Sequence, residues 1–159
     1  VIDERDKEVC DLNKIVTNHP IDVITNRLSS EGYNVVINLP EEGPQILASP
    51  NQVQQILIQL LENAEDAVDP GGKIEISVDS VVTENDFYAV LTVSDNGMGI
   101  PEENIEKIFQ PFFTTKGKHG TGLGMMIVAN IVNNLGGTIG VKTAPGEGTS
   151  FRMVFPQKR

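Results

Sequence analysis

The sequence predicts a single domain of the α+β class, because two β-hairpins are interspersed with amphipathic helices along the chain. The chain has 159 residues, of which 39% are apolar, and this is sufficient for one buried core. The first hairpin is expected over 73–94, where alternating apolar residues are interrupted by a turn at 83–86. The second is expected over 138–155, around a turn rich in glycine at 144–148.

The helices are predicted from apolar residues that recur every three or four positions. The strongest begins at Ser49, with the serine as its cap and Pro50 at its first helical position, and Pro70 stops it. The other expected elements are helical pieces at 11–16, 20–30 and 102–109, an apolar helix that follows the glycine-rich turn at 120–124, a strand at 33–39 and a short extended segment at 45–48.

Composition excludes several classes of function. The net charge of −10 argues against a sequence-independent hold on nucleic acid or an anionic membrane, because both require a basic surface. No apolar run approaches the roughly 18 residues needed to span a bilayer, and the first residues do not form a secretion signal. The single cysteine, Cys10, predicts a reducing compartment and an inert helix residue without a zinc site. We therefore expect a cytoplasmic domain with no nucleic-acid partner and no membrane contact of its own.

The most informative stretch begins at Asp95, where the second strand of the first hairpin ends. Gly97 and Gly99 follow, separated by one residue, and Ile100 closes the stretch. A carboxylate beside backbone without side chains gives a fixed acceptor that a flat ring or a phosphate can approach closely. The alternative is a simple turn in which the Asp95 side chain bonds its own backbone, because Asp, Asn and Gly are ordinary turn residues.

A polar row lies at the edge of the apolar stripe on the strongest helix. Asn63 is flanked by Gln59 one turn earlier and by Asp66 one turn later. A carboxamide oxygen is a hard, neutral ligand that suits Mg²⁺, an ion that takes few protein oxygens together with substrate phosphates. The alternative is a solvated helix flank.

Two adjoining segments carry a second indication of phosphate binding. Phe112 precedes a locally basic loop in which Thr115 and Lys116 are candidates to reach a phosphate, with the aromatic residue at the root of a lid. The glycine-rich turn at 120–124 then enters an apolar helix, so free backbone N–H groups and the positive helix end face an anion. The turn is neither a Walker loop nor a dinucleotide fingerprint, and a plain helix-entry loop is the alternative.

Five motifs together resemble the ATP-binding catalytic domain of sensor histidine kinases, which belongs to a superfamily with gyrase, heat-shock chaperone and mismatch-repair ATPases. They occur in the family's order and span about 45–155: 60–67, 95–100, 109–116, 120–124 and 146–149. The resemblance implies a two-layer α/β sandwich of the Bergerat type, in which helices cover one face of a mixed, mostly antiparallel sheet. It implies a catalytic domain over 19–159, and 1–18 as the possible end of a dimerisation helix and linker.

The resemblance also implies roles for individual residues. Asp95 accepts from the exocyclic amino group of adenine, helped by a water near Thr149, and Asn63 coordinates a Mg²⁺ ion that bridges the phosphates. Lys116 contacts the terminal phosphoryl group, and Lys116 and Gln59 are the catalytic candidates. The implied nucleotide-binding residues are Asn63, Asp66, Asp95, Gly97, Gly99, Ile100, Phe112, Thr115, Lys116, Gly120, Thr121, Gly122, Leu123, Gly124 and Thr149.

Two positions depart from the family pattern. Gln59 stands where the family often has Asn, and Asp66 stands where it often has a basic residue, so phosphate screening falls more heavily on Mg²⁺ and Lys116. Related ATPases carry a glutamate at the position of Gln59 to activate water, and glutamine cannot take a proton at neutral pH. We therefore expect phosphoryl transfer from ATP in preference to hydrolysis.

The expected acceptor is a histidine on a separate dimerisation domain of the same kinase, with a response regulator downstream and ADP as the product. Neither His19 nor His119 lies in the His-Glu/Asp helix motif of a phosphoacceptor segment. The alternatives are a gyrase-like or mismatch-repair-like ATPase, a serine kinase of the anti-sigma type, and a module that senses nucleotide without transferring phosphate.

Overall fold

A five-stranded mixed sheet forms the centre of the computed structural model, which describes residues 7–109 and 124–158. The strand order is β2-β4-β5-β7-β6. β2 pairs with β4 in parallel and the other neighbours are antiparallel, so the predicted mixed, mostly antiparallel sheet is confirmed. The strands are β2 (Asn34–Asn38), β4 (Lys73–Val82), β5 (Phe87–Asp95), β6 (Thr138–Ala144) and β7 (Gly148–Pro156).

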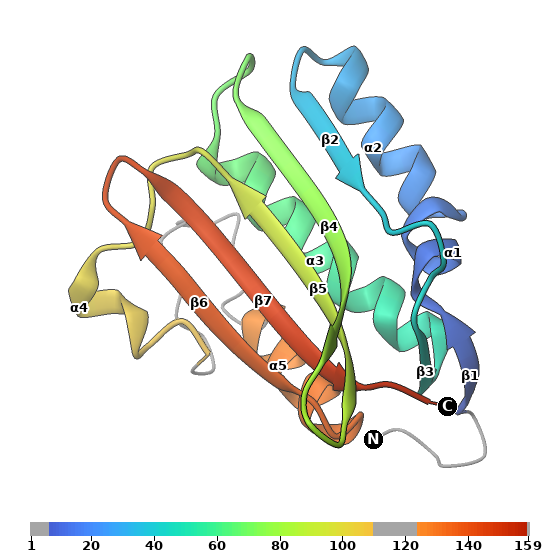
Figure 1. Ribbon diagram of the computed structural model, residues 1–159. Coiled ribbons are helices and arrows are strands. Elements are labelled where there is room, and N and C mark those ends of the chain that lie inside the picture. Colours follow the sequence, from blue (N-terminus) through green and yellow to red (C-terminus); the bar gives the residue numbers. More distant parts are fainter. Residues whose placement is uncertain (1–6, 110–123, 159) are drawn as a thin grey trace.

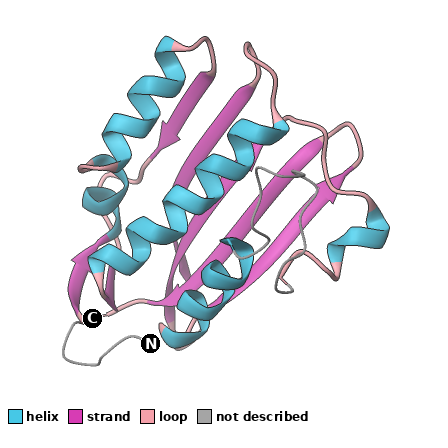
Figure 2. Ribbon diagram, turned by 180° about the vertical axis from the view of Figure 1, so that it is seen from behind, coloured by secondary structure: helices cyan, strands magenta, loops and turns pink. Residues whose placement is uncertain are grey.

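In the described part of the chain, helices cover one face of this sheet and none covers the other (Figures 1 and 2). The covering layer contains α2 (Ile21–Ser30), α3 (Pro50–Ala67) and α5 (Gly124–Asn134), and α1 (Leu12–Thr17) leads into α2. This is the two-layer sandwich that the motifs imply. Within the described residues, no helix combines the length and the apolarity needed to cross a membrane.

The core lies between the sheet and the helices. It is formed by alternate residues of the strands and by residues that recur every three or four positions on the helices. Every second residue of β5 points at the helices, and Ala89, Leu91 and Val93 are at most 2% exposed. Ser49 occupies the N-cap position of α3 and Pro50 its first turn, as predicted, although the serine side chain makes no capping hydrogen bond. The buried stripe of α3 consists of Val53, Ile56, Leu57, Leu60, Leu61 and Ala64.

The N-terminal segment differs from its prediction. Residues 8–11 form a strand, β1 (Glu8–Asp11), which pairs antiparallel with β3 (Gln45–Ala48), so Cys10 lies in a strand and not in a helix. The Asp11 side chain then caps α1 by accepting from the N–H of Asn13 at 2.9 Å. Leu12 in α1 is fully buried, so the described part of 1–18 packs into the domain. A partner strand more than 30 residues away leaves no local signature, which is why the pattern alone indicated a helix.

Burial raises the pKa of the Cys10 thiol, which donates to the carbonyl of Ala48 at 3.3 Å. A thiol with a raised pKa is a poor nucleophile.

The helix predicted over 102–109 is shorter than expected. α4 (Glu102–Ile105) ends after one turn, and residues 106–109 continue as turns. The N–H of Lys107 donates to the carbonyl of Asn104 at 2.9 Å, three residues back, which is the tighter spacing of a turn.

Candidate functional site

Asp95 is the last residue of β5, and its side chain lies on the helix-covered face of the sheet. The alternation places it there, because Leu91 and Val93 precede it with their side chains in the core. One carboxylate oxygen, Oδ1, accepts from the N–H of Gly97 at 2.8 Å. The turn contact considered as the alternative therefore exists. This one hydrogen bond does not use all the acceptor positions of the Asp95 carboxylate, because an ionised carboxylate has about four.

The surroundings of Asp95 raise its pKa above the ordinary value of 3.8. Burial is the main cause, because removal from water penalises the charged form. Hydrogen bonds from the backbone of Gly97 and Thr149 act in the opposite direction and lower the pKa. A partly buried carboxylate at the end of a strand costs folding free energy, and such groups are frequent at functional sites.

The loop that follows Asp95 is held on three sides. The Asn96 side chain accepts from the N–H of Lys73 at 2.8 Å, which ties the loop to the start of β4. The N–H of Met98 donates to the carbonyl of Ala67 at 3.1 Å, at the end of α3. The N–H of Gly146 donates to the carbonyl of Met98 at 2.7 Å, from the turn between β6 and β7. The loop is thus fixed relative to both layers.

Packing within the protein explains the two glycines of this loop. A β-carbon at Gly97 would collide with the carbonyl oxygen of Ala67. Gly99 has φ +74°, and a β-carbon there would collide with the carbonyl oxygen of Ala144. The sequence suggested that these glycines let a ligand approach. The close packing of the loop is a separate requirement that only the structure reveals.

Thr149 lies opposite Asp95 on β7 and is 6% exposed. Its hydroxyl oxygen is 2.9 Å from Oγ1 of Thr143 on β6, which in turn accepts from the N–H of Ile100 at 2.9 Å. Sequence reasoning missed Thr143. The sequence could have indicated Thr143 only through its position opposite Thr149 in the second hairpin. That position is known only when the pairing register of the hairpin is known. The same end of the sheet has a hollow of about 260 Å³, lined by Ser94, Asp95, Lys142, Thr143, Ala144, Glu147, Gly148, Thr149 and Ser150.

A second group of predicted residues meets between α3 and α5. Nδ2 of Asn63 is 2.9 Å from the sulfur of Met125. The side-chain oxygen of Gln59 lies against Gly124, because a β-carbon added at that glycine would collide with it. Asp66 is exposed on the same helix. The structure therefore brings the amide side chains of α3 to the start of α5, where a phosphate site was predicted.

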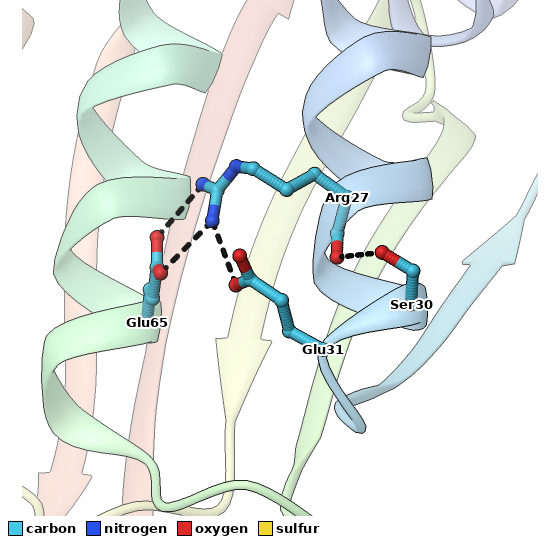
Figure 3. Close-up of polar contacts among 4 residues, drawn as sticks. All are labelled: Arg27, Ser30, Glu31 and Glu65. Carbon is cyan, nitrogen blue, oxygen red and sulfur yellow. Dashed lines mark hydrogen bonds and ion pairs between the residues drawn. The ribbon is translucent and has the colours of Figure 1, made fainter.

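The last turns of α3 connect these two groups. Asn63 precedes Ala67 by four residues, or about one helical turn, and the carbonyl of Ala67 receives the N–H of Met98. Ion pairs made by Arg27 connect the same turns of α3 to α2 (Figure 3). Arg27 contacts both carboxylate oxygens of Glu65, at 2.9 and 3.1 Å, and also contacts Glu31 at 2.9 Å. These partners raise the pKa of Arg27, first through the Glu65 hydrogen bond, so the guanidinium stays charged.

The sequence matches one family model over most of this framework. Residues 48–159 match the model described as histidine kinase-, DNA gyrase B- and HSP90-like ATPase. The chain belongs to this ATPase family.

Two solved structures of histidine kinase ThkA have the same fold as this chain. The nucleotide-free catalytic domain of histidine kinase ThkA is 30% identical, with a TM-score of 0.81 and 95% of each chain covered. The complex of ThkA with response regulator protein TrrA gives a TM-score of 0.78 at 27% identity, covering 96% of this chain and 42% of that one.

Among curated relatives, sporulation kinase A of Bacillus subtilis (strain 168) is 35% identical over 152 residues. The match covers 96% of this chain but only 24% of that protein, so the chain spans about a quarter of its length.

Several residues predicted for this ATPase-family site lie outside the described part of the chain. Of the glycine turn, only Gly124 is described, at the first position of α5. The predicted residues that lie outside are Phe112, Thr115, Lys116, Gly120, Thr121, Gly122 and Leu123. Their roles remain predictions.

Proposed function

We propose that this domain binds ATP with Mg²⁺ and transfers the terminal phosphoryl group to a histidine on a separate dimerisation domain. The main support is that two groups of candidate residues lie near each other along α3. A carboxylate and a threonine hydroxyl, from Asp95 and Thr149, lie beyond its end, and amide side chains lie one to two turns earlier, against α5. Histidine kinases are among the relatives of the chain, which fits this arrangement.

The residues present fit the nucleotide. Asp95 offers an acceptor to an exocyclic amino group, and its raised pKa reflects a partly dry surrounding in which such a hydrogen bond is strong. Asn63 supplies a neutral oxygen suited to Mg²⁺, and Gly124 opens a helix whose N–H groups favour phosphate. When bound, the ion with ATP supplies charge neutralisation for the phosphoryl group that is transferred.

Gln59 favours transfer over hydrolysis. Its side-chain oxygen lies against Gly124, close to where phosphates are proposed to bind, but a carboxamide does not accept a proton at neutral pH. Water activation in a gyrase-type ATPase requires a general base at this point. We therefore assign Gln59 a positioning role, and Lys116 the contact with the terminal phosphoryl group.

The proposed partners follow from the acceptor chemistry. A histidine on a dimerisation domain of the same kinase receives the phosphoryl group, and a response regulator accepts the group next. The complex of ThkA with TrrA supports a regulator as a partner. We propose that this exchange takes place in the cytoplasm.

A transfer assay tests the proposed function. The chain is mixed with a histidine-bearing dimerisation domain and ATP labelled at the terminal phosphate. We expect label on the partner that is lost in acid and kept in base, as for phosphohistidine. Acid-stable label would instead indicate a serine kinase, rapid phosphate release an ATPase, and binding without transfer a nucleotide sensor. Any of these three results would contradict the proposal.

Replacing Asn63 with alanine should remove most of the Mg²⁺ dependence of ATP binding, because the ion loses its protein oxygen. We expect ATP affinity with Mg²⁺ to fall about tenfold, roughly 1.4 kcal/mol, and affinity in EDTA to change little. Calorimetry with and without the ion measures both. The control is Asn51→Ala, at an exposed asparagine near the start of α3. An equal loss of affinity under both conditions would refute the assignment.

A further inference from the structure

We propose that Thr143 determines the purine selectivity of the site by fixing the direction of the Thr149 hydroxyl. In this inference Thr143 is a positioning residue, and the ligand it selects is a purine with an amino group at position 6. The inference rests on the proposed nucleotide site and adds a residue to it. The observation behind it is how the hydroxyl protons of Thr143 and Thr149 are shared near the turn between β6 and β7.

Oγ1 of Thr143 has three polar neighbours at 2.9 Å. The N–H of Ile100 donates to it, and it donates to the carbonyl oxygen of Gly148. The third neighbour is Oγ1 of Thr149, a contact in which either hydroxyl is able to donate. A threonine hydroxyl has one proton and two lone pairs. A carbonyl oxygen only accepts, so the proton of Thr143 goes to Gly148.

That assignment settles the third contact. Because the single proton of Thr143 is used, the hydroxyl of Thr149 must donate to Thr143. The lone pairs of Thr149 remain, so toward a ligand, or toward a water that bridges to one, Thr149 acts only as an acceptor. Asp95, its cross-strand neighbour, is also an acceptor when ionised.

Because Asp95 and Thr149 offer only hydrogen-bond acceptors to the ligand, this end of the site distinguishes adenine from guanine. Adenine carries an exocyclic amino group, a donor, where guanine carries a carbonyl oxygen, an acceptor. Guanine would place its oxygen against the Asp95 carboxylate and would find no donor in Thr149. The burial of Thr149, at 6% exposure, makes such an unpaired contact costly.

Valine at position 143 keeps the shape of threonine and removes both of its hydrogen-bonding functions. The proton of Thr149 loses its acceptor and is released to point at the ligand, where it suits a carbonyl oxygen. The Ile100 N–H also loses its acceptor, which loosens the loop after Asp95. We therefore expect ADP to bind less tightly and GDP to bind as tightly as before or better.

The experiment titrates ADP and GDP separately by calorimetry against the complete chain and its variants. For Thr143→Val, the ratio of ADP to GDP affinity should fall at least about tenfold. Thr143→Ser keeps the hydroxyl and should keep the ratio. Thr138→Val is the matched control, because it makes the same replacement at an exposed threonine at the other end of β6. It should leave the ratio unchanged.

The ratio separates selectivity from general destabilisation, because a loss of folded protein lowers both apparent affinities equally. If the valine variant does not fold, Thr143→Cys replaces it, with a weak donor and acceptor and a smaller expected loss of the ratio. An unchanged ratio in a folded variant overturns the inference and leaves the nucleotide site intact. Failure of the parent chain to bind ADP overturns the proposed function itself.

Discussion

Asp95→Asn should lower ADP affinity by at least about 30-fold, a cost of about 2 kcal/mol or more. The carboxylate offers acceptors only, whereas an amide presents one acceptor and two donors to an amino group that itself donates. Calorimetric titration with ADP measures the change. Asp79→Asn is the matched control, because Asp79 is an exposed carboxylate on the neighbouring strand β4. ADP affinity within threefold of the parent in Asp95→Asn would refute the proposed purine site.

The same variant should not lose folding stability, and the sign follows from the pKa of Asp95. A group whose pKa is raised on folding contributes stability below its unfolded pKa and loses it as the pH rises through the folded value. At neutral pH the ionised Asp95 is therefore a net cost to the fold. Asparagine removes this cost and still accepts from Gly97, so urea unfolding should give an equal or higher free energy. Lost binding in a destabilised variant would instead indicate damage to the loop.

The pH dependence of the parent chain gives an independent measurement. In the proposed site adenine requires the ionised carboxylate, so ADP affinity should fall as the pH drops through the pKa of Asp95. Because that pKa lies above 3.8, the fall should begin at a higher pH than for an exposed aspartate.

Gly148→Ala should destabilise the domain by about 3 kcal/mol. Alanine at a positive φ costs about 1–2 kcal/mol. The remainder comes from overpacking, because a β-carbon at Gly148 would collide with the carbonyl oxygen of Asp95 and approach Asn96. The collision would displace the end of β5, so ADP affinity should also fall. Urea unfolding and calorimetry measure the two effects.

Gly71→Ala provides the control for backbone conformation. Gly71 and Gly148 share a φ of +96°, but a β-carbon at Gly71 would have no atom within 4 Å. Its replacement should therefore cost only the conformational part, about 1–2 kcal/mol, and should leave ADP affinity unchanged. Equal destabilisation by the two substitutions would mean that the strand end at Asp95 adapts without cost.

The sequence by itself determined most elements of the fold and indicated the candidate residues of the site. The α3 stripe and the alternating strands were predictable because a helix and a half-buried strand each impose a period that burial enforces locally. The placement of Asp95 at a strand end and of Asn63 at the edge of an apolar stripe followed from the same periods. The structure confirms both positions, and the family match confirms the class of ATPase.

Tertiary structure alone decided what depends on pairing between distant segments. β1 forms because Glu8–Asp11 pairs with β3, and Thr143 contacts Thr149 because the register of the hairpin places the two side by side. Gly97 is constrained by the end of α3, about 30 residues earlier in the chain. A hydrogen bond or a steric collision acts between atoms in space, whereas a sequence period reports only which face of one element is buried.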